Sequence, residues 1–155
     1  MVDVNIKQDS NLERSILGCL LQDGSLIQDE SVAKLKPSDF IYEHERIVFN
    51  SMKELETEGK PIDSTTVINR LKENDKLEKV GGVYYITGLP LDVTSTAHLP
   101  SYVETLISYT KHNEKMRVVE DVRTGKADPS KLEDLTGAER GQDYDMSDTG
   151  NAQLL

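Results

Sequence analysis

The sequence predicts an all-α fold in which a small helical globule is followed by a long helix. Apolar residues recur every three or four positions in successive segments, as they do along one face of a helix. Glycine, proline and aspartate separate these segments and mark their ends. Hydrophobic residues make up 36% of the 155 residues and aromatic residues 5%, which predicts one lean, mostly aliphatic core.

The first two helices are expected in the N-terminal third of the chain. Ser10 and Glu13 have the spacing of a capping box, and helix-spaced apolar residues follow them, so a first helix is expected from about 11 to 22. A second cap signal begins at Ser25, and the apolar face that follows it ends at Pro37. We expect one helix between these two residues.

Two further helices are expected in the middle of the chain. Phe40 and Ile41 should fill the core from a short turn, ahead of a third helix that ends at Gly59. Asp63 is a good N-cap for a short fourth helix, which should end in the polar stretch 72–79. The acidic residues of the third helix should face water: Glu54, Glu56 and Glu58.

The apolar run 83–86 is ambiguous by its spacing alone. It is short, it ends at a Gly-Leu-Pro turn, and no alternating partner strand lies nearby, so we expect a helix of one or two turns. Tyr84 and Tyr85 are candidates for stacking on single-stranded DNA. Their neighbours Val83 and Ile86 are apolar rather than basic, which favours packing in the core.

The last helix is expected to begin near Ser95 or Thr96 and to continue to Thr124. Pro100 fits this helix because it would lie in the first turn. About 25 helical residues span roughly 40 Å at a rise of 1.5 Å per residue. A helix of that length overruns a globule of short helices, so its C-terminal half should protrude or pack on another arm or another subunit.

The composition changes after Gly125, where Gly, Asp and Ser become frequent and apolar residues become rare. We therefore expect three parts. An N-terminal arm covers 1–10, a helical domain covers 11–126, and a linker or tail covers 127–155 and leads to a missing downstream domain.

The motifs of common catalytic and metal sites are missing from the sequence. A nucleotide-hydrolysing motor needs the pattern GxxxxGK[ST], and both Gly-Lys pairs, at 59–60 and 125–126, fail it at the first glycine and after the lysine. His44, His98 and His112 lie too far apart for a common metal-ligand spacing. We expect no catalytic residues, no metal and no cofactor.

Charge and apolar content exclude further classes. The net charge of -10 disfavours unassisted binding to nucleic acid. No segment approaches the apolar length of a membrane span, and the N-terminus lacks the pattern of a signal peptide, so no membrane association is expected. The single cysteine, Cys19, fits a reducing, cytoplasmic setting and is expected to be a small core residue.

Six blocks of sequence, taken in order, resemble the N-terminal domain of the DnaB replicative helicase. Together they extend over about residues 11–124, and no single block is diagnostic. The blocks are 12–21 (LERSILGCLL), 35–40 (LKPSDF), 44–49 (HERIVF), 58–63 (EGKPID), 80–86 (VGGVYYI) and 102–107 (YVETLI).

The resemblance implies a helical globule followed by a helical hairpin, with hairpins that pair and form a collar where primase and loader proteins dock. The residues that it places on the first hairpin arm and its pairing surface are Leu106, Tyr109, Thr110, Asn113, Met116 and Val119. The same stripe also fits an ordinary intramolecular core. The chain departs from the family after Gly125, where residues 128–140 supply only a stub instead of a second long arm.

A shorter resemblance lies near the end of the chain. Residues 147–152 (SDTGNA) are similar to the opening of a domain in phage and plasmid primase-helicases of the poxvirus type. This similarity suggests that the chain stops at a domain boundary, ahead of a motor domain that would contact DNA.

Three functions follow as hypotheses. The first is a non-catalytic domain of a phage or mobile-element replication helicase that organises its own subunits as a dimer or higher oligomer, or recruits primase or a loader. The second is a stand-alone regulator that mimics this domain and occupies host replication proteins. The third is a weak single-stranded DNA-binding module, whose DNA-facing residues would be Lys111, Lys115, Arg117 and Arg123.

Overall fold

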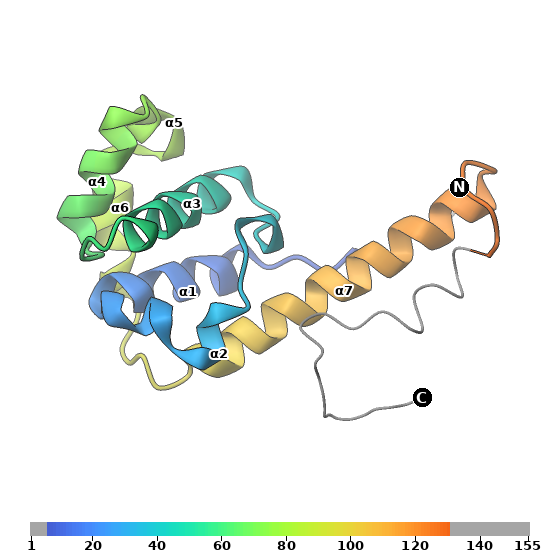
Figure 1. Ribbon diagram of the computed structural model, residues 1–155, viewed down its shortest axis with the longest axis horizontal. Coiled ribbons are helices and arrows are strands. Elements are labelled where there is room, and N and C mark those ends of the chain that lie inside the picture. The colour runs from blue at the N-terminus through green and yellow to red at the C-terminus, as the bar shows by residue number, and fades with distance from the viewer. Residues whose placement is uncertain (1–5, 131–155) are drawn as a thin grey trace. The chain divides into compact units, whose positions relative to one another are not determined.

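The computed structural model describes residues 6–130, and every regular element in this part of the chain is a helix (Figure 1). The expected all-α fold is therefore confirmed. The elements are α1 (Ser10–Gln22), η1 (Gly24–Gln28), α2 (Glu30–Ala33), η2 (Pro37–Asp39), α3 (Glu43–Thr57), α4 (Ser64–Glu73), α5 (Leu77–Val80), α6 (Gly82–Gly88), η3 (Pro90–Asp92) and α7 (Leu99–Arg123).

The chain divides into two compact units. One unit is Gln8–Ser108, and the other combines Met1–Lys7 with Tyr109–Leu155. Helix α7 contributes its first part to the Gln8–Ser108 unit and its remainder to the other unit.

The core of the Gln8–Ser108 unit is built around α1. This helix packs against η1, η3 and α3, while α3 also packs against α4 and α5 (Figure 1). Aliphatic side chains fill most of the core, and the rings of Phe40 and Phe49 stack within it at a centroid distance of 4.8 Å. Cys19 is fully buried in this core as a free thiol, in agreement with the sequence prediction.

Helix α1 begins in a different way from the predicted capping box. Asp9, not Ser10, is the N-cap, and its carboxylate accepts the backbone N–H of Leu12. Glu13 does not reach back to the cap, because it lies fully buried on the inner face of the helix. Glu13 lies three positions before Ile16 and four before Leu17. It shares their buried face because residues at these separations lie on one side of a helix.

The prediction of one continuous helix between Ser25 and Pro37 is wrong. The segment instead forms η1 and α2, separated at Asp29. Asp23 and Asp29 each accept the backbone N–H of the residue two positions on, Ser25 and Ser31, and so each begins a new short helix. Aspartate side chains favour such local bonds over a continuing helix.

The middle of the chain agrees with most of the expected elements. Asp63 caps α4 through the backbone N–H of Thr66, and the run 83–86 lies inside α6. Two core assignments are wrong, because Ile41 is 40% exposed and Tyr84 is 90% exposed. In each pair of apolar neighbours only one side chain faces the core, since adjacent residues point in different directions.

Helix α7 is a single continuous helix. It begins at Leu99, a few residues later than expected, and Pro100 lies in its first turn as predicted. The preceding residues 94–98 instead form bends and turns.

Gly18 allows α1 to approach η3 closely. A Cβ atom at this position would lie 2.5 Å from the carbonyl oxygen of Leu89 and 2.6 Å from a methyl carbon of Val93. Both distances are too short for non-bonded atoms, and the first neighbour is backbone that cannot rotate away. The glycine in the LGCLL stretch is therefore required by packing.

We expect Gly18→Ala to lower the free energy of unfolding by about 1–3 kcal/mol, because the overlap outweighs the higher helix propensity of alanine. Gly88→Ala is the matched control, since a Cβ there has no neighbour within 4 Å. That variant should be neutral or more stable by up to about 1 kcal/mol. Urea unfolding measures both, and equal stability of the two variants would contradict the packing argument.

Candidate protein-binding surface on the long helix

The first part of α7 is committed to the core of the Gln8–Ser108 unit. Leu99, Val103 and Leu106 are only 1–2% exposed, and all three belong to the continuous hydrophobic core. Leu106 was predicted to lie on a pairing surface, and the structure places it against its own globule. Among the described residues, none beyond Ile107 belongs to this core.

The second part of α7 contacts the N-terminal arm within the other unit. The side-chain amide of Asn113, which is 7% exposed, pairs with the main chain of Lys7 at both of its ends. The backbone N–H of Lys7 donates to Oδ1 over 2.7 Å, and Nδ2 donates to the backbone carbonyl of Lys7 over 2.8 Å. The ammonium group of Lys7 also lies 6.0 Å from the centre of the Tyr109 ring, within reach of a cation–π contact.

The remaining predicted pairing residues are partly accessible. Thr110 and Met116 are half-buried, and Val119 is 38% exposed. The structure therefore divides the predicted stripe into a core residue, two residues next to the arm, and an accessible end. The role of the stripe in association stays a prediction.

The four predicted DNA-facing cations are all exposed on α7: Lys111, Lys115, Arg117 and Arg123. Arg123 forms an ion pair with Glu120 one turn earlier, which lowers the local positive charge. The structure thus gathers these cations on one helix, and their contact with DNA stays a prediction.

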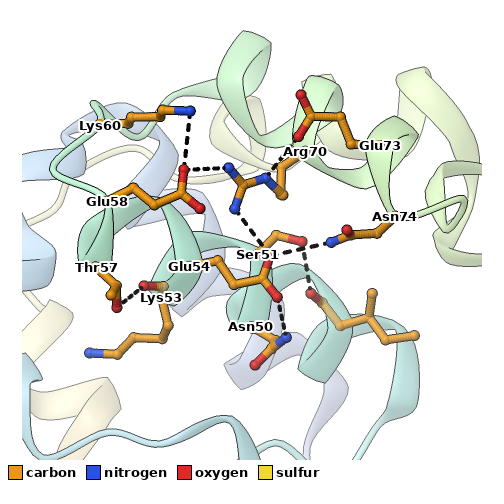
Figure 2. Close-up of polar contacts among 11 residues, drawn as sticks. Asn50, Ser51, Lys53, Glu54, Thr57, Glu58, Lys60, Arg70, Glu73 and Asn74 are labelled. Atoms are coloured by element: carbon orange, nitrogen blue, oxygen red, sulfur yellow. Dashed lines mark hydrogen bonds and ion pairs between the residues drawn. The ribbon is translucent and has the colours of Figure 1, made fainter.

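An ion-pair cluster around Arg70 joins α3 to α4 (Figure 2). Its guanidinium donates to Glu58 over 2.7 Å, to Glu73 over 3.1 Å and to Glu54 over 3.2 Å. Lys60 lies 3.1 Å from the same oxygen of Glu58. Glu54 was expected to face water only, and instead it is half-buried and bound to this arginine.

The Arg70 cluster has electrostatic consequences at its edge. Hydrogen bonds from Arg70 and Lys60 lower the pKa of Glu58 from 4.5 to about 2, so this carboxylate stays charged except in strong acid. A groove of about 530 Å³ beside the cluster is lined by Arg46, Asn50, Glu54 and Asn74 among others. The two amides point their Nδ2 groups at Glu54, so the polar groups of this groove largely satisfy one another (Figure 2).

Among the buried carboxyl groups of the globule, those of Glu13 and Glu45 were both missed by sequence reasoning. Glu13 accepts the backbone N–H of Ile41 over 2.8 Å and that of Tyr42 over 3.3 Å, which ties α1 to the chain just before α3. Glu45 accepts a hydrogen bond from the hydroxyl of Tyr85. Since Glu13 is 0% exposed and bound to main chain, it is placed to hold structure rather than to meet a substrate.

Burial of the Glu13 side chain disfavours the ionised form of its carboxyl group. Removal from water raises the pKa of Glu13 from 4.5 to about 7, although its two backbone hydrogen bonds act in the lowering direction. Burial also raises the pKa of the Tyr85 hydroxyl, and its bond to Glu45 acts in the same direction.

Within residues 6–130, no three His, Cys, Asp or Glu side chains gather in a way that would hold a metal ion. None of the helices in this part of the chain has the length and apolarity needed to traverse a lipid bilayer. The polar clusters described above are ion pairs and main-chain anchors.

Comparison with known families agrees with this description. Residues 5–108 match the DnaB-like helicase N-terminal domain family. This chain belongs to that family. The resemblance inferred from the six sequence blocks is thereby confirmed for the DnaB-like domain, whereas the similarity at residues 147–152 lies outside the described residues.

Replicative helicases and a solved DnaB domain are similar to this chain. Replicative DNA helicase DnaC of Bacillus subtilis (strain 168) is 33% identical over 98 residues, which are 63% of this chain and 21% of that protein. Replicative DNA helicase DnaB of Buchnera aphidicola subsp. Baizongia pistaciae (strain Bp) is 32% identical over 101 residues, which are 65% of this chain and 22% of that protein.

The crystal structure of the N-terminal domain of DnaB helicase from Mycobacterium tuberculosis superimposes with a TM-score of 0.71 at 25% identity. The match covers 83% of this chain and 93% of that domain. The chain therefore spans about a fifth of the helicases that it matches, and it corresponds to nearly all of the solved DnaB N-terminal domain.

We expect the stability of this DnaB-like domain to fall as the pH rises from 4.5 to 7. In this window the unfolded state has released the Glu13 proton while the folded state still holds it, so each rise in pH favours unfolding. The rise in the pKa from 4.5 to about 7 corresponds to about 3 kcal/mol for a fully buried group.

Glu13→Gln should remove this dependence, because glutamine resembles the protonated carboxyl and does not titrate. Urea unfolding of both proteins at several pH values between 4 and 8 measures the difference. Parallel stability curves for the two proteins would show that Glu13 does not titrate in this window.

Proposed function

We propose that this chain is the non-catalytic N-terminal domain of a replicative helicase or primase-helicase, encoded by a phage or mobile element. In this role it associates with other subunits and binds primase or a helicase loader, while a motor domain elsewhere in the protein contacts DNA. Support comes from its family and from relatives that are replicative helicases about five times longer than the matched segment.

One observation supports α7 as the binding element. The core of the globule takes its last residues from the first part of this helix, at Leu106 and Ile107, yet the helix continues to Arg123. Apolar side chains follow on that continuation, and among them Val119 is substantially exposed. An exposed apolar side chain on a long helix is a common site of helix–helix contact.

The surface charge favours a protein partner over nucleic acid. The net charge of -10 repels phosphate. One of the cations of α7, Arg123, is also paired with the carboxylate of Glu120. A basic face on a primase or loader, or a complementary α7 of another copy, would meet no such repulsion.

We expect Val119→Glu to weaken self-association at least about tenfold, because it places a charge at the centre of an apolar helix contact. Val83→Glu is the matched control, since Val83 is a similarly exposed valine on α6, 42% against 38%. Sedimentation equilibrium over a concentration series gives the dissociation constants. Equal effects of the two substitutions, or a wild-type chain that is monomeric and ignores primase and loader, would contradict the proposal.

A further inference from the structure

The contact between Asn113 and Lys7 recognises main chain rather than a side chain. One amide side chain pairs with both the N–H and the C=O of a single residue, over 2.7 and 2.8 Å. This is the hydrogen-bonding pattern of one residue in a strand ladder, provided here by an asparagine on a helix. Any residue except proline at position 7 offers the same two groups, because only proline lacks the N–H.

The asparagine is otherwise poorly suited to its position. Asparagine lowers helix propensity in the middle of a helix, and burial of an amide costs free energy unless its hydrogen bonds are made. Asn113 lies near the middle of α7 and is 7% exposed, and the arm residue Lys7 supplies partners for both ends of its amide. Tyr109, one turn earlier, lies beneath the Lys7 ammonium and widens the contact.

The arm has a short connection to the globule. Only Gln8 separates Lys7 from Asp9, the cap of α1, and Lys7 itself is exposed. A terminal segment that is attached by a short hinge and held by few bonds is suited to exchange between identical chains, because the exchanged form makes the same contacts.

We propose that Tyr109 and Asn113 form a receptor for an extended main-chain segment, and that the arm of a second copy of this chain occupies it by exchange. The site binds the copy's residues 6–7 in the same manner as the chain's own arm. This inference goes beyond association through the apolar residues of α7, because it assigns a hydrogen-bonded site that Val119 does not contribute to.

Two substitutions in the full chain separate the halves of this contact. Lys7→Pro removes the donor from the arm and leaves the receptor open. Asn113→Leu removes the receptor and leaves the arm intact. Lys7→Ala is the control, because it keeps both main-chain groups and loses only the ammonium over Tyr109. Circular dichroism checks that each variant keeps the helical fold.

The mixture of the two variants is the decisive experiment. The open receptor of Lys7→Pro and the free arm of Asn113→Leu complement each other, so a labelled Lys7→Pro chain should bind Asn113→Leu at least about tenfold more tightly than it binds itself. Sedimentation with fluorescence detection measures both pairings. Lys7→Ala should lose at most about fivefold in affinity, because it gives up only the ammonium over Tyr109.

A mixed pairing no tighter than the self-pairing would overturn the proposal. If Lys7→Pro alone and Asn113→Leu alone are monomeric and only their mixture associates, arm exchange is supported and association through Val119 is contradicted. If each variant alone associates through Val119 and the mixture associates no more tightly, association through Val119 is supported and arm exchange is contradicted.

A peptide titration keeps the test decisive if Asn113→Leu fails to fold. The peptide DVNIKQDS, residues 3–10, should shift the side-chain amide resonance of Asn113 in the Lys7→Pro chain and saturate. The peptide DVNIPQDS should bind at least about tenfold more weakly, whereas DVNIAQDS should lose at most about fivefold, because it lacks only the ammonium over Tyr109. The wild-type chain should need more peptide, because its own arm competes intramolecularly. Equal binding of all three peptides would exclude main-chain recognition at Asn113.

Discussion

The Gln8–Ser108 unit depends on the burial of α1 around its whole circumference. Residues 16–21 are six consecutive buried positions, so the second half of this helix is covered on every side rather than along one stripe. Such a helix segment needs neighbours at close range all around it, and Gly18 permits one such close approach, at η3. The neighbours of α1 are η1, η3 and α3, and α3 in turn packs against η2, α4 and α5.

A polar group beside a buried helix needs hydrogen-bond partners, because its burial otherwise costs free energy. Glu13 is tolerated beside this core because two backbone N–H groups donate hydrogen bonds to its carboxyl group. Both N–H groups belong to the segment that leads into α3. The Arg70 cluster performs a similar task at the surface, where one guanidinium joins three carboxylates from α3 and α4 (Figure 2). Both contacts set the position of α3, one at its start and one at its end.

Much of this fold follows from local sequence signals, and the errors have local physical causes. The cap at Asp63, the helix at 83–86 and the long final helix were predictable because side-chain bonding and apolar spacing determine them within a few residues. The division at Asp29 was missed because aspartate competes with the helix through a bond that apolar spacing does not reveal.

The candidate site was less predictable than the fold. The positions of Met116 and Val119 follow from helical spacing on α7. The pairing of Asn113 with Lys7 joins residues 106 positions apart through main-chain atoms, and a sequence pattern contains no information about such a bond. The position of Glu13 on an apolar face was visible in its spacing to Ile16, although the capping-box pattern masked it.

The buried thiol of Cys19 makes the native chain suitable for site-specific chemistry. Removal from water raises the pKa of this thiol, so the thiolate that reacts with maleimides and disulfide reagents is rare while the core is closed. A cysteine introduced at an exposed position of α7 would take up a dye selectively in the folded protein, with Cys19 left in place. Only unfolding would bring the native sulfur into contact with reagent, so its rate of modification would report how often α1 loses its cover.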